Sequence, residues 1–254
     1  AAASFALAAV IHILSVGLIL VYKYWCYRTT TYDFGLFAQM FEYMRVTGLP
    51  LTTLERNGLL THFAVHLSPI YYVLLPFYMI WPDPAMLQIM QPVVVASGLI
   101  PLLLLTRHLK LKPVLQVILA FIYVMHPGII GSSLYDLHEN CFLAPLLFWV
   151  ILFLEKRRWP GFLIASALVL MVKEDAALYL LAIAIYAIFS RRQRRFGLVL
   201  FVLASAYFTF ALFLLSKIGS GPMVGRFDNV MAEPSLGLLS IPLTLLRNPA
   251  YLIS

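Results

Sequence analysis

Long apolar runs separated by short polar segments make up most of the chain, and their lengths indicate which of them cross a membrane. Residues 4–22 and 85–105 are each about long enough to span a bilayer as an α-helix. Further apolar runs cover residues 114–125, 142–154 and 198–215. The pattern predicts an all-α protein, a polytopic transmembrane helical bundle.

The segment between the first two spans, residues 28–82, predicts helices that lie at the membrane surface. Aromatic residues and Met44 recur at helical spacing over residues 34–47, which is typical of an amphipathic interfacial helix. Gly48 is expected to end this helix, because glycine commonly follows the last helical turn. A polar loop is expected over residues 51–61.

A second short helix is expected near Ser68 and Pro69, which are suited to the N-cap and the first helical position. The apolar run from Ile70 to Trp81 is short for a span, and Pro76 interrupts it. We expect a partly embedded surface helix here. The aromatic groups at Tyr22–Tyr27 and Tyr71-Tyr72 are expected to be interface anchors.

Residues 161–189 form a long apolar stretch that holds Lys173, Glu174 and Asp175 near its middle. Basic clusters flank it at 155–158 and 191–195. A single helix would place one cluster on the wrong side of the membrane, because basic residues favour the cytoplasmic face. The pattern therefore predicts two shorter helices that meet at the charged triplet.

The distribution of basic residues predicts the orientation of the bundle. Placing the clusters at 107–112, 155–158 and 191–195 in the cytoplasm puts the loop at 28–82 and the three acidic segments on the extracytoplasmic face. Lys23 and Arg28 then lie outside, against the rule. If residues 70–81 crossed the membrane, Asp33 and Asp136 would fall on opposite faces.

The composition narrows the class of protein. Of the 254 residues, 62% are hydrophobic and 11% are charged, whereas a soluble domain has about 25% charged residues. We expect an integral membrane protein that interacts with the lipid bilayer. The net charge of +7 lies in short clusters, so there is no basic face for nucleic acid. We expect residues 1–254 to form a single domain, an N-terminal segment of a longer chain.

Acidic residues at the ends of apolar runs are the candidate catalytic groups. We interpret Asp33, Asp136 and Glu139 as catalytic carboxylates of a membrane enzyme. For Asp33 the alternative is an N-cap that accepts backbone N–H groups of the following helix. For Asp136 and Glu139 the alternative is an ordinary solvated loop.

The charged triplet Lys173, Glu174 and Asp175 carries a physical argument for function. A charge at the centre of a membrane helix costs roughly 2.5–3.5 kcal/mol on insertion scales. The triplet must therefore face a polar cavity or mark a turn near the outer surface. An ion pair within the triplet is the alternative. Lys173 and Arg226 could bind phosphate, although a loop arginine is more often only solvated.

The histidines are candidate substrate or metal ligands. His62 and His66 are four residues apart, so on a helix they share one face, as metal ligands can. Together with Asp33 they could hold a divalent cation, with Mg or Mn favoured over Zn if carboxylates dominate. The alternative is a pair of interfacial histidines bonded to nearby loops. His138 lies between the two acids of its loop and is a candidate substrate ligand.

The order of these features resembles the GT-C glycosyltransferase superfamily, which includes the protein O-mannosyltransferases and the aminoarabinose transferases. It is most similar to a prokaryotic branch of predicted membrane proteins. The pattern of that branch is Tyr-Asp-x-Gly-x-Phe-x-Gln, His-Phe-x-x-His-x-Ser-Pro, Asp-x-His-Glu and Lys-Glu-Asp. These motifs stand here at Tyr32–Gln39, His62–Pro69, Asp136–Glu139 and Lys173–Asp175.

The resemblance implies transfer of a sugar from a polyprenyl-phosphate donor on the extracytoplasmic face of a prokaryotic plasma membrane. By that likeness Asp33 would be the base or a metal-positioning carboxylate, and Asp136 the second acid. The superfamily adds a further membrane or soluble portion for acceptor specificity, beyond the residues present here.

Two other classes of function stay open. The first is a transporter or flippase for a lipid-linked or anionic substrate, with the intramembrane charges along its path. The second is a non-catalytic subunit of a larger membrane complex that retains a degenerate GT-C site. Inverted repeats would favour transport, and none is evident in the sequence.

Overall fold

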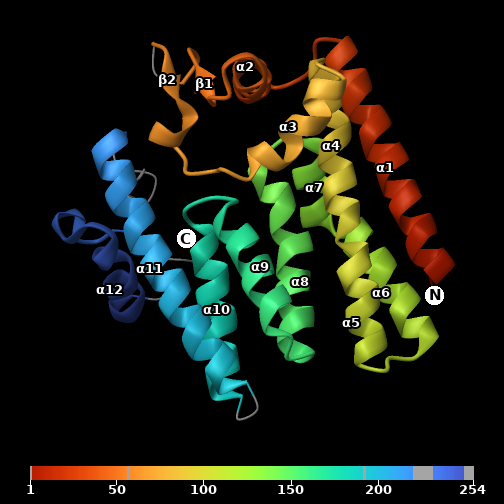
Figure 1. Ribbon diagram of the computed structural model, residues 1–254, viewed down its shortest axis with the longest axis vertical. Helices are drawn as coiled ribbons and strands as arrows, with labels where there is room; N and C mark the ends of the chain where they lie inside the picture. Colours follow the sequence, from red (N-terminus) through yellow and green to blue (C-terminus); the bar gives the residue numbers. More distant parts are fainter. Residues whose placement is uncertain (1, 56–57, 191–192, 220–230, 249–254) are drawn as a thin grey trace.

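The computed structural model describes residues 2–55, 58–190, 193–219 and 231–248, and their secondary structure is almost entirely helical (Figure 1). The helices are α1 (Ala2–Trp25), α2 (Thr31–Thr47), α3 (Tyr71–Ile80), α4 (Pro84–Ser97), α5 (Leu99–His108), α6 (Pro113–Met125), α7 (Pro127–Leu134), α8 (Leu143–Glu155), α9 (Trp159–Leu170), α10 (Ala176–Phe189), α11 (Arg194–Ile218) and α12 (Ser240–Arg247). Short 3-10 helices are η1 (His62–Ala64), η2 (Glu139–Phe142) and η4 (Pro234–Leu239), and the strands are β1 (Leu51–Thr52) and β2 (Leu60–Thr61).

Within the described residues, four helical segments are long and apolar enough to cross a membrane: Ala2–Trp25, Pro84–His108, Pro113–Leu134 and Arg194–Ile218. They confirm the expected spans at 4–22 and 85–105. They also lengthen the runs expected at 114–125 and 198–215. The protein is an all-α, polytopic integral membrane protein.

The residues between α9 and α10 confirm the predicted division of the stretch 161–189. α9 has 12 residues and α10 has 14, and the Lys173–Asp175 triplet lies in the turn between them. The break follows from the cost of burying three charged side chains inside one continuous apolar helix. α10 packs along α11, and α9 packs along α8.

The extramembrane region differs from expectation in two details. The expected polar loop over 51–61 contains a short antiparallel pair, in which Leu51 faces Thr61 and Thr52 faces Leu60. Ser68 does not cap α3, because the N-cap position is held by Ile70 and the buried Ser68 hydroxyl has no hydrogen-bond partner. Backbone bonds from Tyr71 N–H to Ser68 and from Tyr72 N–H to Pro69 start the helix instead.

The basic connections and the segment at 28–82 lie at opposite ends of the bundle (Figure 1). The basic connections between α5 and α6 and between α8 and α9 lie at the lower end, together with the facing ends of α10 and α11. α2 and the β1–β2 pair lie at the upper end. At ten residues, α3 is too short to cross a bilayer, so the chain from α2 to α4 stays at the upper end. The basic connections thus lie at one end of the bundle, and the segment at 28–82 lies at the other.

Gly98 lies where α4 meets α5, and the close packing there predicts a cost for any side chain. A Cβ at this position would lie 2.6 Å from the Tyr123 hydroxyl and 3.3 Å from Pro145 Cα. Tyr123 cannot move freely, because its hydroxyl donates to the Val95 carbonyl at 2.7 Å. We expect Gly98→Ala to lower the free energy of unfolding by about 1–3 kcal/mol, measured by denaturation in micelles.

Gly131→Ala is the matched control for Gly98→Ala. A Cβ at Gly131 in α7 would have no neighbour within 4 Å. Alanine in an open helical position is neutral or mildly stabilising. Equal stabilities of the two variants would contradict the packing argument at Gly98.

Candidate functional site

A cavity of about 290 Å³ lies at the end of the bundle that carries α2, and four separate segments supply its walls. α2 contributes the first wall, the β1–β2 connection and η1 the second, the loop after α7 the third, and the α9–α10 turn the fourth. Its lining includes Asp33, Glu55, His62, His66, His138, Glu139 and Lys173, with Tyr32, Leu36, Phe37, Val65 and Tyr135. The cavity therefore gathers six residues that the sequence singled out, from segments more than a hundred positions apart.

Asp33 lies in the first turn of α2, where the positive end of the helix dipole favours an acid. It is half-buried and accepts a hydrogen bond from the Tyr135 hydroxyl. That bond raises the pKa of Tyr135, so the phenol stays a donor near neutral pH. The N-cap of α2 is Thr30, without a side-chain cap bond. Asp33 thus faces the cavity rather than closing the helix end.

His62 is almost completely buried, with its side chain 2% exposed, and it pairs with Glu55. The Nδ1 atom lies 3.1 Å from Glu55 Oε1 and 3.2 Å from Oε2. The other ring nitrogen, Nε2, has no hydrogen-bond partner. A carboxylate at Nδ1 fixes the ring orientation and leaves Nε2 as the atom available to a ligand.

His66 repeats this arrangement with an acid from the α9–α10 turn. Its Nδ1 lies 2.9 Å from Glu174 Oε1, and Glu174 Oε2 accepts the Leu67 backbone N–H at 3.0 Å. Glu174 thereby joins the turn of the charged triplet to the chain after η1. The His62 and His66 rings lie side by side, with centroids 6.0 Å apart.

Glu139 is the centre of a buried charge network on the floor of the cavity. Its Oε2 accepts the Tyr71 hydroxyl at 2.5 Å, and its Oε1 lies 3.2 Å from Lys173 Nζ. The Tyr71 hydroxyl also accepts the Glu139 backbone N–H at 3.1 Å. His138 Nδ1 lies 3.3 Å from Glu139 Oε2. An ion pair this deep depends on each partner to neutralise the other.

The network sets which groups carry charge. Burial acts to raise the pKa of Glu139, but the neighbouring His138 and Lys173 and the Tyr71 hydrogen bond outweigh it and hold that pKa below its usual value. Burial lowers the pKa of His138. Burial therefore favours the uncharged form of His138, and Lys173, whose Nζ lies 3.2 Å from Glu139 Oε1, is the other basic partner of that carboxylate.

The structure separates Asp136 from the cavity residues. Asp136 is fully buried and does not line the cavity. Its carboxylate accepts the Thr30 N–H at 2.8 Å, the Thr30 hydroxyl, and the Gln88 amide at 2.7 Å. Lys23 Nζ lies 4.0 Å away. These partners tie the loop to α4 and to the chain between α1 and α2.

Two other predicted substrate ligands do not contribute to the described cavity. Asp175 is exposed and is not part of the cavity lining. Arg226 lies outside the described residues. Lys173 is therefore the member of the charged triplet that lines the cavity, and Glu174 supports the lining residue His66 from outside it.

The divalent-cation hypothesis fits the described residues only in part. The carboxylate-paired rings of His62 and His66 match the supporting geometry of metal-bound histidines. Among the described residues, however, no three histidine, cysteine or acidic side chains are grouped so that they could hold a metal ion. Asp33 is thus not brought together with the two histidines as a third ligand, and we derive no step through a metal.

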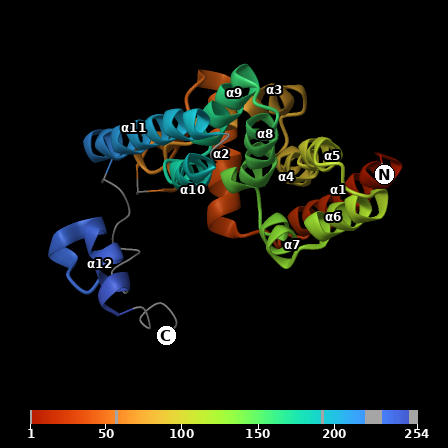
Figure 2. The ribbon, with the colours of Figure 1, turned by 90° about the horizontal axis from the view of Figure 1, so that it is seen from below.

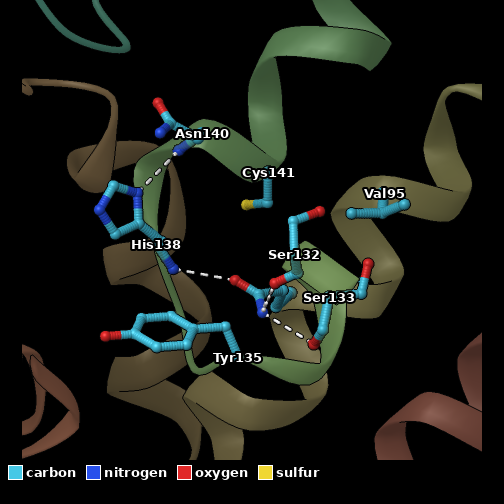
Figure 3. A pocket seen from close by; sticks show the side chains of 8 residues that line it. Val95, Ser132, Ser133, Tyr135, His138, Asn140 and Cys141 are labelled. Atoms are coloured by element: carbon cyan, nitrogen blue, oxygen red, sulfur yellow. Dashed lines mark hydrogen bonds between the residues drawn. The ribbon is translucent and has the colours of Figure 1, made fainter. Parts of the chain in front are cut away.

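A second, smaller cavity of about 270 Å³ lies behind the loop that carries His138 (Figure 3). Figure 3 shows Val95, Ser132 and Ser133 on the side opposite His138. The Gln91 side chain fixes the loop, since its Oε1 accepts the His138 N–H at 2.9 Å and its Nε2 donates to the Ser133 carbonyl at 3.0 Å. Tyr135 and His138 border both cavities.

Glu55, Tyr71 and Tyr135 are site residues that the sequence analysis did not single out. Glu55 falls in a segment read as a polar loop, and only the β1–β2 pairing returns the chain to His62. Tyr71 was expected to be an interface anchor with Tyr72, but it is buried beside Glu139. The one available signal was its hydroxyl, because a buried tyrosine needs a hydrogen-bond partner.

Comparison with known proteins gives the family but no activity. No curated protein and no solved structure matches the chain. A family model described as predicted membrane protein (DUF2079) matches residues 23–253, a range that includes every described residue of the cavity lining. The chain therefore belongs to the DUF2079 family of predicted membrane proteins.

Proposed function

We propose that the protein is a membrane glycosyltransferase that moves a sugar from a polyprenyl-phosphate donor to an acceptor at the extracytoplasmic face of a prokaryotic plasma membrane. The observation that carries the proposal is the convergence of Asp33, His62, His66, Glu139 and Lys173 on one cavity. The segments that line this cavity lie at the end of the bundle away from the basic connections, and basic segments favour the cytoplasmic side of a membrane.

Glycosyl transfer needs two chemical groups that Asp33 and Lys173 can supply from different walls of the cavity. An acceptor hydroxyl needs a base, and Asp33 is a half-buried carboxylate with the Tyr135 donor to orient it. A departing lipid phosphate needs positive charge, which Lys173 supplies from the floor. Asp33 and Lys173 come from α2 and from the α9–α10 turn, so a substrate between them would contact both.

One feature favours the alternative of transport. α9 and α10 are two short helices that meet at charged residues, and broken helices of this kind form substrate sites in transporters. A transporter would move the lipid across the bilayer with its sugar attached. A transferase would release the lipid phosphate from the sugar on one side.

Proteoliposomes that hold the protein and a polyprenyl-phosphate labelled in its sugar distinguish these functions. We expect the label to leave the lipid when an acceptor is present and the cavity face is accessible, and mass spectrometry of the extracted lipid measures the loss. A positioned general base typically raises the reaction rate by about 10²–10⁴-fold. Asp33→Asn is therefore the matched control, and we expect it to slow the loss of label by that factor. Label that changes leaflet while still bound to its lipid would establish transport and contradict the transferase proposal.

A further inference from the structure

Glu174 fastens the chain that carries His66 to the turn between α9 and α10. Its Oε2 accepts the Leu67 backbone N–H at 3.0 Å, and its Oε1 lies 2.9 Å from His66 Nδ1. The Ile70 N–H also donates to the Met171 carbonyl at 2.9 Å, and α3 lies beside α9 in the view from below (Figure 2). Glu174 therefore cannot turn away from the imidazole ring without breaking one of its own bonds.

The ionisation of Glu174 decides which nitrogen of His66 carries a proton. Burial acts to raise the pKa of Glu174, but the bonds from His66 and from the Leu67 N–H outweigh it and hold that pKa below its usual value. Near neutral pH the group is a carboxylate, which only accepts hydrogen bonds. His66 Nδ1 must then be the donor, and in a neutral imidazole this leaves the lone pair on Nε2.

His66 and His62 present this lone pair from the same wall of the cavity. Both rings line it, and the side chain of His66 is 15% exposed. The ring centroids are 6.0 Å apart. Glu55 binds His62 Nδ1 in the same way, and His62 Nε2 has no hydrogen-bond partner among the described residues. The wall therefore offers hydrogen-bond acceptors at both Nε2 atoms.

An acceptor at Nε2 selects the chemistry of the group that binds there. The charged oxygens of a phosphate are themselves acceptors, so they do not match it, whereas a hydroxyl group donates and does. A metal ion also uses a lone pair, but the described residues include no group of three histidine, cysteine or acidic side chains placed to hold one. The fitting ligand is a hydroxyl group, such as those of a sugar.

We propose that His66 Nε2 binds a hydroxyl group of the substrate, and that Glu174 is a positioning residue that fixes the tautomer of His66. The hydroxyl site rests on the proposed function, because glycosyl transfer is what brings a sugar to this cavity. Neighbouring residues of one turn then serve different groups of the substrate. Lys173 binds the phosphate, and Glu174 acts through His66 on a hydroxyl of the transferred sugar or of the acceptor.

Nuclear magnetic resonance of the full chain with ¹⁵N-labelled histidine, in a sugar-free detergent, reads the tautomer directly. The resonances that disappear in His66→Gln identify His66. We expect Nδ1 to be protonated and Nε2 to be free. Glu174→Gln should reverse this, because its amide oxygen can still accept the Leu67 N–H while its NH₂ group donates to Nδ1. A proton on Nε2 in the parent, with or without one on Nδ1, would overturn the proposal.

Glycerol and inorganic phosphate are the probes for the bound group. Glycerol should shift the His66 Nε2 resonance in the parent but not in Glu174→Gln, and phosphate should not shift it. A shift with phosphate, or none with glycerol, would contradict the hydroxyl assignment.

The transfer assay tests the positioning role. Glu174→Gln should raise KM about tenfold and leave kcat little changed, since the hydroxyl bond is made in the ground state and the transition state alike. The substrate whose KM rises, lipid-linked sugar or acceptor, is the one that carries the hydroxyl. His66→Ala combined with Glu174→Gln should be no worse than His66→Ala alone. Additive losses would show that Glu174 does not act through His66.

Two acids provide matched controls. Glu55→Gln should reverse the tautomer of His62 and leave that of His66 unchanged. Glu42→Gln removes an exposed acid of α2 that pairs with Arg45, and it should alter neither tautomer nor KM. A parent with the expected tautomer and glycerol shift but no transfer would contradict the proposed function and still support the hydroxyl site.

Discussion

Replacement of Lys173 by methionine is expected to lower the free energy of unfolding by about 3–5 kcal/mol, because it leaves a buried carboxylate without its partner. The affected carboxylate is Glu139, which is 1% exposed and 3.2 Å from Lys173 Nζ. Methionine keeps the length of the side chain, so the loss measures charge and not a cavity. Chemical denaturation in micelles, followed by tryptophan fluorescence, gives the difference.

A second variant tests whether the charge pair is the cause. Lys173→Met combined with Glu139→Gln removes both charges, and replacement of a buried pair by neutral groups is often close to neutral. The double variant should therefore regain most of the lost stability. Sugar transfer should be lost in both the single and the double variant, because both lack the Lys173 ammonium group. Arg45→Met is the surface control, since its pair with Glu42 is exposed and worth less than about 1 kcal/mol. A loss in the double variant equal to that in Lys173→Met would refute the pairing argument.

The second large effect is expected from two acids that the sequence could not tell apart. Asp33→Asn should lower the rate of sugar transfer by about 10²–10⁴-fold and leave unfolding almost unchanged, because Asp33 is half-buried at the cavity wall. Asp136→Asn should lower the free energy of unfolding and leave the transfer rate of the folded protein almost unchanged. It weakens bonds to Thr30 and Gln88, at a cost of about 1–3 kcal/mol.

The comparison is made on folded protein at matched concentration, with turnover and denaturation measured on the same preparations. A non-catalytic subunit would show no dependence on Asp33 in any transfer assay of the complex. If Asp136→Asn abolished turnover without any loss of stability, Asp136 would have a role in the reaction that its burial does not suggest.

Much of the fold could be predicted because insertion energetics leaves few choices for apolar runs. The spans at 4–22 and 85–105 follow from length, and the break at the charged triplet follows from the cost of burying Lys173 and Glu174 in one helix. Ser68 shows the limit: a suitable cap residue stands at the expected place, but the helix starts through backbone bonds alone.

The sequence could name most of the residues that line the site, but not which of them face the cavity or contact one another. His62, His66, Glu139 and Lys173 were recognisable as polar groups in apolar surroundings. Asp136 and Glu139 are three residues apart in one loop, and which of them faces the cavity depends on partners such as Gln88 and Tyr71 from other helices. No local pattern carries that information, and the same reason hides Glu55.

The short length of α9 determines how deep the floor of the site lies. Its 12 residues rise about 18 Å, whereas the hydrocarbon layer is about 30 Å thick. If α9 starts at the cytoplasmic boundary, Lys173 sits below the level of the outer headgroups. A substrate phosphate must then descend below the headgroup level to reach it, and the polar side chains that line the cavity lower the desolvation cost of that descent.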